Sequence, residues 1–166
     1  MKLVTDAHYT GNQAVVAGVL FDNWDAAEPA NEYIVNQNNI ADYEPGSFYK
    51  RELPCLLALI SEIKESMELI VVDGFVTLGT EQRPGLGCHL YEKLGCRVPI
   101  VGVAKTAFAG TPKECEVLRG RSKNPLYVTA AGICLDEAKI GVNQMHGQHR
   151  IPTLLKRVDY LCRHGA

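Results

Sequence analysis

The chain has 166 residues, enough for one domain with a substantial core and too few for two comfortable domains. Hydrophobic residues make up 46% and charged residues 22% of it, as in an ordinary soluble globular protein. The formal net charge of −2 excludes a general electrostatic attraction to nucleic acid. Any contact with DNA or RNA must therefore come from a local basic patch or through metal ions.

The cysteines are scattered along the chain and form no C-x-x-C pair, which argues against a zinc site. No apolar run near Met1 resembles a secretory signal, and no segment approaches the ~20 apolar residues that span a membrane. We therefore expect a cytoplasmic protein that contacts no membrane and has reduced thiols, most of which fill the core. The cysteines are Cys55, Cys88, Cys96, Cys115, Cys134 and Cys162.

Three strands are predicted at the N-terminus, over residues 2–9, 13–21 and 31–37. The Gly-Asn pair at 11–12 is a hairpin turn signal, so these strands are expected to form an antiparallel meander. The Pro-Gly pair that follows at 45–46 excludes a regular element there and predicts a loop.

From Phe48 to Lys64 the apolar residues fall at helical spacing, which predicts a long helix. Pro54 is tolerated only in the first turn of a helix, so this helix is expected to begin near residues 49–53. The run ELIVVDG at 68–74 is short, continuous and apolar, which is typical of a buried parallel strand that ends in a polar residue.

The rest of the chain alternates between strands and helices and includes a polar loop over residues 106–123. Antiparallel hairpins followed by alternating elements predict an α/β fold with a mixed sheet flanked by helices, an antiparallel N-terminal meander and then parallel strands. The remaining predicted strands are 97–105 and 125–132, and the remaining helices are 85–95, 135–147 and 151–164.

Four acids fall on four different predicted elements. Active sites of open α/β sheets form at the carboxyl ends of strands, where Asp73 is expected to lie. Hydrolysis of a phosphodiester requires a nucleophilic hydroxide and neutralisation of charge on the phosphoryl group, and one or two Mg²⁺ ions held by carboxylates do both. The acids are Asp6 in the first strand, Glu52 at the start of the first helix, Asp73 and, in the last helix, Asp159.

Each acid taken singly also has a plainer interpretation. Asp6 fits a strand-end cap, Glu52 a solvated charge at a helix N-terminus, and Asp73 the start of a turn. Asp159 fits a surface ion pair, since Arg157 and Arg163 lie close to it in the sequence. Composition and periodicity alone leave the function undecided.

Motifs from about residue 4 to residue 161 resemble those of the endonuclease V family. The most specific is the stretch from Tyr43 to Pro54, which carries that family's Y-x-P-G, four varied residues and R-E-x-P with the spacing preserved. The others are a strand similar to D-x-S-Y at Asp6, V-D-G at 72–74, I-V-G-V-A-K at 100–105, P-L-Y-V at 125–128, and R-I-P at 150–152 with an acid seven residues later at Asp159.

The resemblance implies a ribonuclease H-like fold in a single domain over residues 1–166, and a hydrolase that uses Mg²⁺, with Mn²⁺ as an alternative. It also implies that Lys105 binds a phosphate or stabilises developing charge, although a strand-end lysine that extends into solvent is the plainer interpretation. The metal-binding carboxylates that it implies are Asp6, Glu52, Asp73 and Asp159.

The loop around Tyr43, Pro45 and Gly46 corresponds to the wedge that, in this family, enters nucleic acid beside the damaged base. A rigid proline beside an aromatic ring suits the unstacking of bases, and a buried tyrosine that anchors the loop is the alternative. Gly74 belongs to the V-D-G motif and Arg83 is similar to the arginine of the family's H-P-R, so both are expected at the substrate.

The resemblance implies cleavage of a DNA or RNA strand near inosine, the product of adenine deamination, in DNA repair or RNA processing. The chain departs from the family at Phe75, where a histidine usually follows the V-D-G motif, and at Glu44, where the wedge is usually apolar. These departures keep two alternatives open: a nucleic-acid-binding module that has lost catalysis, and a nuclease with an altered base specificity.

Overall fold

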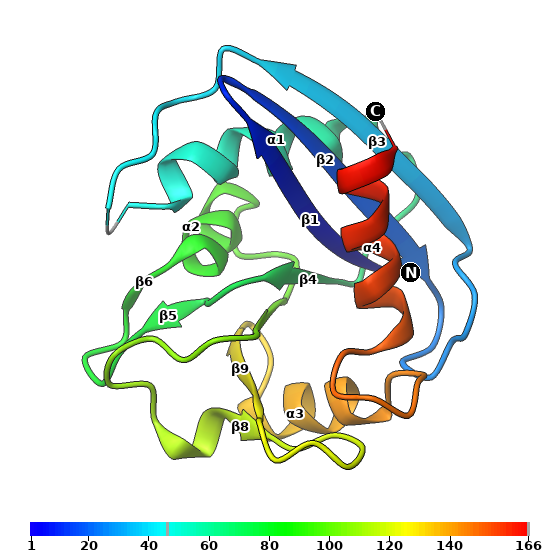
Figure 1. Cartoon of the computed structure of the whole chain (residues 1–166), viewed down its shortest axis with the longest axis vertical. Helices are drawn as coiled ribbons and strands as arrows, with labels where there is room; N and C mark the ends of the chain where they lie inside the picture. The colour runs from blue at the N-terminus through cyan, green and yellow to red at the C-terminus, as the bar shows by residue number, and fades with distance from the viewer. Residues whose placement is uncertain (46, 166) are drawn as a thin grey trace.

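The computed structural model describes residues 1–45 and 47–165, most of which surround a seven-stranded mixed sheet (Figure 1). The strands of this sheet are β1 Lys2–Thr10, β2 Gln13–Phe21, β3 Asn31–Asn38, β4 Leu69–Asp73, β7 Ile100–Ala104, β8 Glu116–Val117 and β9 Leu126–Ala131. They lie side by side in the order β3-β2-β1-β4-β7-β9-β8.

The predicted antiparallel meander at the N-terminus is confirmed. β1 and β2 pair from Lys2 opposite Phe21 to Thr10 opposite Gln13, and β3 pairs with the other side of β2. Gly11 turns the chain between β1 and β2 with a φ of 61°, a left-handed conformation that glycine adopts without the steric cost of a Cβ.

The centre of the sheet is parallel, because β4 pairs parallel with β1 and β7 pairs parallel with β4. β9 runs antiparallel to β7, which corrects the expectation that the second half of the sheet is parallel throughout. The connection between them contains a 3₁₀ helix, Lys113–Cys115, and the two-residue strand β8. A parallel return usually requires an α-helical crossover, and this connection has none, so the chain returns in the opposite direction.

The helices form one layer on each face of the sheet (Figure 1): α1 Tyr49–Glu62 and α2 Leu86–Lys93 cover one face, and α3 Leu135–Gln144 and α4 Thr153–His164 cover the other. Because side chains alternate along a strand, Leu3 belongs to the apolar cluster under α1 and α2, and Val4 to the cluster under α3 and α4. None of the described helices is long and apolar enough to cross a membrane.

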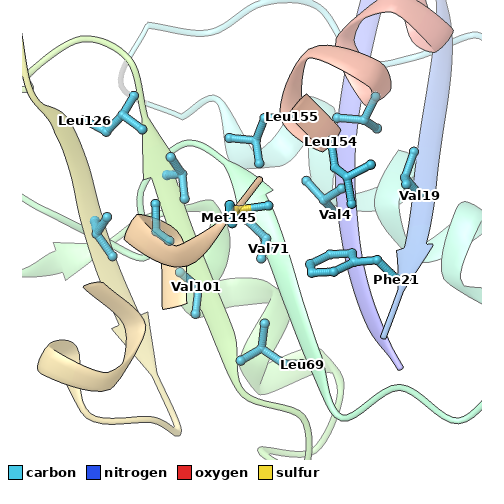
Figure 2. Packing of buried hydrophobic residues seen from close by; sticks show 14 of the residues in the cluster. Val4, Val19, Phe21, Leu69, Val71, Val101, Leu126, Met145, Leu154 and Leu155 are labelled. Atoms are coloured by element: carbon cyan, nitrogen blue, oxygen red, sulfur yellow. The ribbon is translucent and has the colours of Figure 1, made fainter. Parts of the chain in front are cut away.

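Figure 2 shows the apolar cluster on the α4 face, where Val4, Val71 and Val101 of the sheet and Leu154 and Leu155 of α4 lie together. Each of these side chains is at most 6% exposed. Burial of one such aliphatic side chain stabilises the fold by about 1.5–3 kcal/mol. This packing fixes α4 against β1 and β2, and with it the position of every residue that α4 carries.

Three short strands were not expected, namely β8 and the small hairpin of β5 Thr77–Leu78 and β6 Arg83–Pro84. Two-residue strands are too short to show a period in the sequence. Pro54 also differs from its prediction, because it is the sixth residue of α1 and lies beyond the first turn. Pro54 and Lys50 are both exposed, so water can satisfy the Lys50 carbonyl that lacks its intrahelical N–H partner.

All six cysteines are free thiols. Cys55, Cys115 and Cys162 are buried, as core filler should be, but Cys96 and Cys134 are exposed. Cys96 follows the end of α2 and Cys134 is the N-cap of α3, and both positions lie at the surface because they are the ends of helices. Cys88 is partly buried against the cluster under α1 and α2, so the expectation that most thiols fill the core fails only for Cys96 and Cys134.

Candidate active site

The strand register places three of the predicted site residues next to one another. Thr5 lies opposite Val72 and Asp73 lies opposite Val103, so Asp6, Asp73 and Lys105 come at nearly the same level of neighbouring parallel strands. Val4, Val71 and Val103 belong to the cluster under α4, and each lies two residues before one of these three side chains. Because alternate side chains of a strand share one face, all three point to the α4 face of the sheet. They line one small cavity, beneath the side chains of α4.

The two helical acids approach this group from opposite faces of the sheet. Asp159 comes from α4, and its carboxylate, the Asp6 carboxylate and the Cys162 thiol all lie within 4.8 Å of one another. Glu52 comes from the first turn of α1 on the other face, where it lines a larger cavity together with Asp73. The four acids that the sequence singled out therefore converge at the carboxyl edge of the parallel strands.

The proximity of the acids changes their pKa values. Burial is the main cause that raises the pKa of Asp6 to about 7, and the negative charge of Asp73 is the second. The N–H of Ala7 donates a hydrogen bond of 2.8 Å to Asp6 Oδ1, which lowers the pKa in part. Burial, followed by the charges of Asp6 and Asp73, raises the pKa of Glu52 to about 8. Carboxylates that repel one another in this way are stabilised by a cation among them.

Asp159 takes part both in the acid cluster and in an ion pair. Arg163, one helical turn later, donates from Nε to Asp159 Oδ1 at 2.8 Å. Partial burial acts to raise the pKa of Asp159, but the hydrogen bond and the charge of Arg163, with the charge of Lys105, lower it overall. Arg157, the other candidate partner, pairs with Glu32 at 2.6 Å instead. The pKa of Asp159 is thus held low, whereas Asp6 beside it exchanges its proton near neutral pH.

Lys105 directs its amine at the acids, since its Nζ lies 3.7 Å from Asp73 Oδ2. Both side chains are 36% exposed, so this pair remains open to solvent and to a ligand. Its position at the end of β7, beside the acids, would let the ammonium group contact a phosphate that approaches them.

The sequence interpretation missed Cys162 as a neighbour of the acids and treated it as core filler. It lies three residues after Asp159 in α4, and residues three apart share one face of a helix. That spacing was the available signal. Burial is the main cause that raises the pKa of the Cys162 thiol to about 12, and the charges of Asp6 and Asp159 add to it. The thiol that faces the two carboxyl groups is therefore protonated.

A cavity of about 300 Å³ opens on the α1 side of the acids. Glu52 and Asp73 supply its acidic end, and its walls are mostly aromatic and apolar. Gly74 lines it with a φ of 139° and with open space where a side chain would project. The aromatic residues that line it, none of them predicted as site residues, are Phe48, Tyr49, Phe75 and Phe108.

The predicted wedge residues lie beside this cavity. Tyr43 is 55% exposed, so the alternative of a buried tyrosine is wrong, and its ring is 5.3 Å from that of Phe48 in an edge-to-face arrangement. Pro45 is exposed in the same loop, and Gly46 lies outside the described residues. Glu44 pairs with Lys50 at 3.2 Å, which offsets part of the repulsion that its charge would exert on a phosphate.

Arg83 lies near the cavity, beside one of its lining residues, Phe108. It lies in β6 and is exposed, and its guanidinium carbon is 5.9 Å from the centre of the Phe108 ring. Phe108 in turn contacts Phe75 edge to face, with their ring centres 6.5 Å apart. Arg83 therefore lies beside the aromatic wall, but it does not line the cavity itself.

The family described as Endonuclease V matches residues 3–139 of the chain. An Endonuclease V of Geotalea uraniireducens is 33% identical over 115 residues, which cover 69% of this chain and 47% of that protein. Another, of Rhodospirillum centenum, is 30% identical over 136 residues and covers 69% of this chain and 55% of that protein. The chain thus spans about half the length of these curated relatives.

Solved structures of Endonuclease V proteins are also similar to this chain. Endonuclease V of Streptomyces avermitilis has a TM-score of 0.78 at 27% identity, covering 98% of this chain and 79% of that one. Ciona intestinalis Endonuclease V, in complex with a 24mer DNA containing an inosine followed by a ribo-adenosine, has a TM-score of 0.83 at 16% identity, covering 99% and 84%. The predicted ribonuclease H-like mixed sheet is confirmed. Since the family match extends over most of its residues, the chain belongs to the endonuclease V family.

Proposed function

We propose that this protein is a divalent-metal-dependent endonuclease that hydrolyses a phosphodiester bond in nucleic acid containing inosine or another deaminated base. The observation that carries the proposal is the convergence of four carboxyl groups from β1, β4, α1 and α4 at one edge of the sheet. Nothing in the packing of the core requires four acids there, and their mutual repulsion disfavours the fold unless a cation offsets it.

The donor set fits a hard divalent cation. Asp6, Asp73, Glu52 and Asp159 supply carboxylate oxygens, which Mg²⁺ and Mn²⁺ prefer. Such an ion, when bound, neutralises charge on a phosphate and makes a water molecule more acidic. The raised pKa values of Asp6 and Glu52 are consistent with this use, because both carboxyl groups would release their protons to bind it.

The chain's own residues would position the substrate around that centre. Lys105 can donate to a phosphate oxygen beside Asp73, and its positive charge favours the charge that develops there during hydrolysis. The aromatic cavity next to Glu52 has a volume at the lower end of the ~300–1,000 Å³ range of small-ligand sites, which suits one unstacked base. Phe48 and Phe75 offer rings on which that base can stack.

Inosine-containing nucleic acid is the first substrate to test, because the Ciona intestinalis relative was crystallised with inosine-containing DNA. The wall formed by Phe75, Phe108 and Leu78 favours a second candidate function, a nuclease with altered base specificity. An apolar wall offers few hydrogen bonds to the edge of a base, so shape and stacking would select it. In either case we place the enzyme in the cytoplasm, where its six free thiols would stay reduced.

The test uses labelled single- and double-stranded oligonucleotides with and without inosine, in Mg²⁺ or in Mn²⁺. Asp73→Asn keeps the shape of the side chain and removes its charge, so we expect cleavage to fall by about 100-fold or more. Asp136→Asn, which removes an exposed acid in the first turn of α3, is the matched control and should cleave like the wild type.

The outcomes separate the candidate functions. Cleavage near inosine supports the first proposal, and cleavage that ignores inosine keeps the metal chemistry but favours the altered specificity. A wild-type protein that cleaves no substrate and shows no metal-dependent rise in melting temperature would contradict both, and would leave a nucleic-acid-binding module on a nuclease fold.

A further inference from the structure

A second groove, of about 720 Å³, lies between the loop of residues 118–124 and the loop of residues 145–150. Its charged lining is basic: Arg121 and Arg150 contribute guanidinium groups, and no carboxylate lines it. Lys123 is exposed two residues after Arg121. The lining residues are Gly120, Arg121, Ser122, Gln148, His149 and Arg150.

The groove is a built feature, because a buried arginine fixes its two sides to each other. Arg119 is 4% exposed and donates hydrogen bonds to the backbone carbonyls of Met145, Gly147, His149 and Arg150 across the groove. Gly120 approaches the facing loop so closely that a Cβ there would lie 2.3 Å from the carbonyl oxygen of Gln148. The arginines that line the groove are therefore held on loops whose backbones are fixed to each other.

A second arginine connects the groove to the candidate active site. Arg150 donates to the carbonyls of Asn124 at 3.0 Å and Pro125 at 2.8 Å, and also to the carbonyl of Lys105. Lys105 in turn directs its amine at Asp73. Because β9 runs antiparallel to β7, Pro125 lies at the same edge of the sheet as the acids. Arg150, which lines the groove, therefore also contacts the backbone at that edge, at Lys105.

We infer that this groove binds the phosphate backbone of the nucleic acid strand whose scissile bond lies at the acid cluster. The inference rests on the proposed function and adds to it the surface that holds the strand. The net charge of −2 gives no general attraction to nucleic acid, and the acid cluster repels it in the absence of metal. A fixed basic groove beside the acids supplies the local attraction that binding requires, through guanidinium and ammonium contacts to phosphate.

The test compares two double variants that remove the same charge. Arg121→Ala/Lys123→Ala removes the exposed arginine that lines the groove and the exposed lysine that follows it in the same loop. Lys93→Ala/Arg97→Ala removes two exposed cations at and after the end of α2, near the opposite edge of the sheet. All four side chains are exposed, so neither variant should unfold the protein. Binding of an inosine-free single-stranded oligonucleotide is followed by fluorescence anisotropy over a range of salt concentrations, and cleavage kinetics are measured on an inosine substrate.

For the groove variant we expect a roughly tenfold higher Kd at low salt. The slope of log K against log salt should be smaller by about 1.4, because each phosphate of a single strand that a cation neutralises adds about 0.7 to this slope. KM should rise with kcat unchanged, because the groove binds ground state and transition state alike. The Lys93→Ala/Arg97→Ala protein should match the wild type in every measurement.

Two results would overturn the inference, and only the second would also overturn the proposed function. In the first, the wild type cleaves, and the groove variant and the Lys93→Ala/Arg97→Ala protein have the same Kd, salt slope and KM. The groove is then not a strand-binding surface, and the proposed function stands. If the wild type neither binds nor cleaves nucleic acid, the proposed function fails and this inference fails with it.

Discussion

At the residue scale, the surroundings of Asp6 determine its protonation. Asp6 is 7% exposed and faces Asp73 and Asp159, so its carboxylate loses hydration and meets like charges. The pKa of Glu52 is raised in the same way by burial, Asp6 and Asp73. Two acids of the cluster therefore titrate near neutral pH when no cation is bound, and a bound cation would displace the protons that they carry.

The metal-free protein should lose stability as pH rises from 6 to 9. An acid whose pKa is raised by folding binds its proton more tightly in the folded chain, so its contribution to stability is full below the unfolded pKa of about 4. The contribution falls as the pH rises above that value and is fully lost once the pH exceeds the folded pKa. Those folded pKa values are about 7 for Asp6 and about 8 for Glu52. We expect the melting temperature in EDTA to fall by roughly 5–10 °C over this range.

Asp6→Asn should flatten this dependence and melt higher than the wild type at pH 8.5, because it removes one of the repelling charges. Asp136→Asn, which changes an exposed acid outside the cluster, should keep the wild-type slope. Mn²⁺ added at pH 8.5 should restore the wild-type melting temperature. A melting temperature that does not change between pH 6 and 9 would show that the acids are not coupled as their geometry implies.

At the element scale, α4 and the loop before it build much of the site. The apolar side of α4 packs against β1 and β2, and this packing brings Asp159 and Cys162 to Asp6. The loop of residues 145–150 leads into α4 and is held by the guanidinium of Arg119. The position of α4 therefore depends on a buried polar contact as well as on apolar packing.

Arg119→Leu should destabilise the protein by about 3 kcal/mol or more, or roughly 10 °C in melting temperature. The substitution leaves backbone carbonyls of the 145–150 loop without their donor, and a buried unsatisfied group costs about 1–3 kcal/mol. Arg121→Ala, two residues away and exposed, should melt like the wild type. Equal melting temperatures for Arg119→Leu and Arg121→Ala would mean that Arg119 does not hold the loop.

At the scale of the whole molecule, a single sheet links every part of the site. The strand order places β1 beside β4 although more than fifty residues separate them, and it thereby brings Asp6 next to Asp73. Both apolar clusters include residues of β1, β2 and β4, so neither helical layer has a core that is independent of the other. The expectation of one domain over residues 1–166 stays a prediction that unfolding can test.

Urea should unfold the chain in one cooperative transition, as expected for one domain of this size. Trp24, the only tryptophan, packs against Gly141 of α3 and edge-to-face on Phe21 of β2, so its fluorescence reports the contact between a helix and the sheet. The far-ultraviolet circular dichroism reports all helices and strands. The two signals should change at the same urea concentration, and separate midpoints would contradict the single domain.

The sequence by itself determined the elements whose signals are local. Alternation and the Gly11 turn predicted β1 and β2, and the continuous run before Asp73 predicted β4. Helical periodicity placed Glu52 at the start of α1 and Asp159 inside α4, and the motifs singled out both residues. These predictions succeeded because period and turn chemistry depend on residues close together in the chain.

Only the tertiary structure decided the direction of β9, the approach of Cys162 to Asp6, the aromatic wall formed by Phe75 with Phe108, and the contacts of Arg119 across the basic groove. Each of these depends on residues that lie far apart in the sequence or on how an irregular loop packs. Sequence periodicity reports which side of an element is apolar, but not which distant polar group that element meets. The acids of the candidate site could be named from the sequence, whereas their distances, protonation and neighbours follow from how the sheet and α4 pack together.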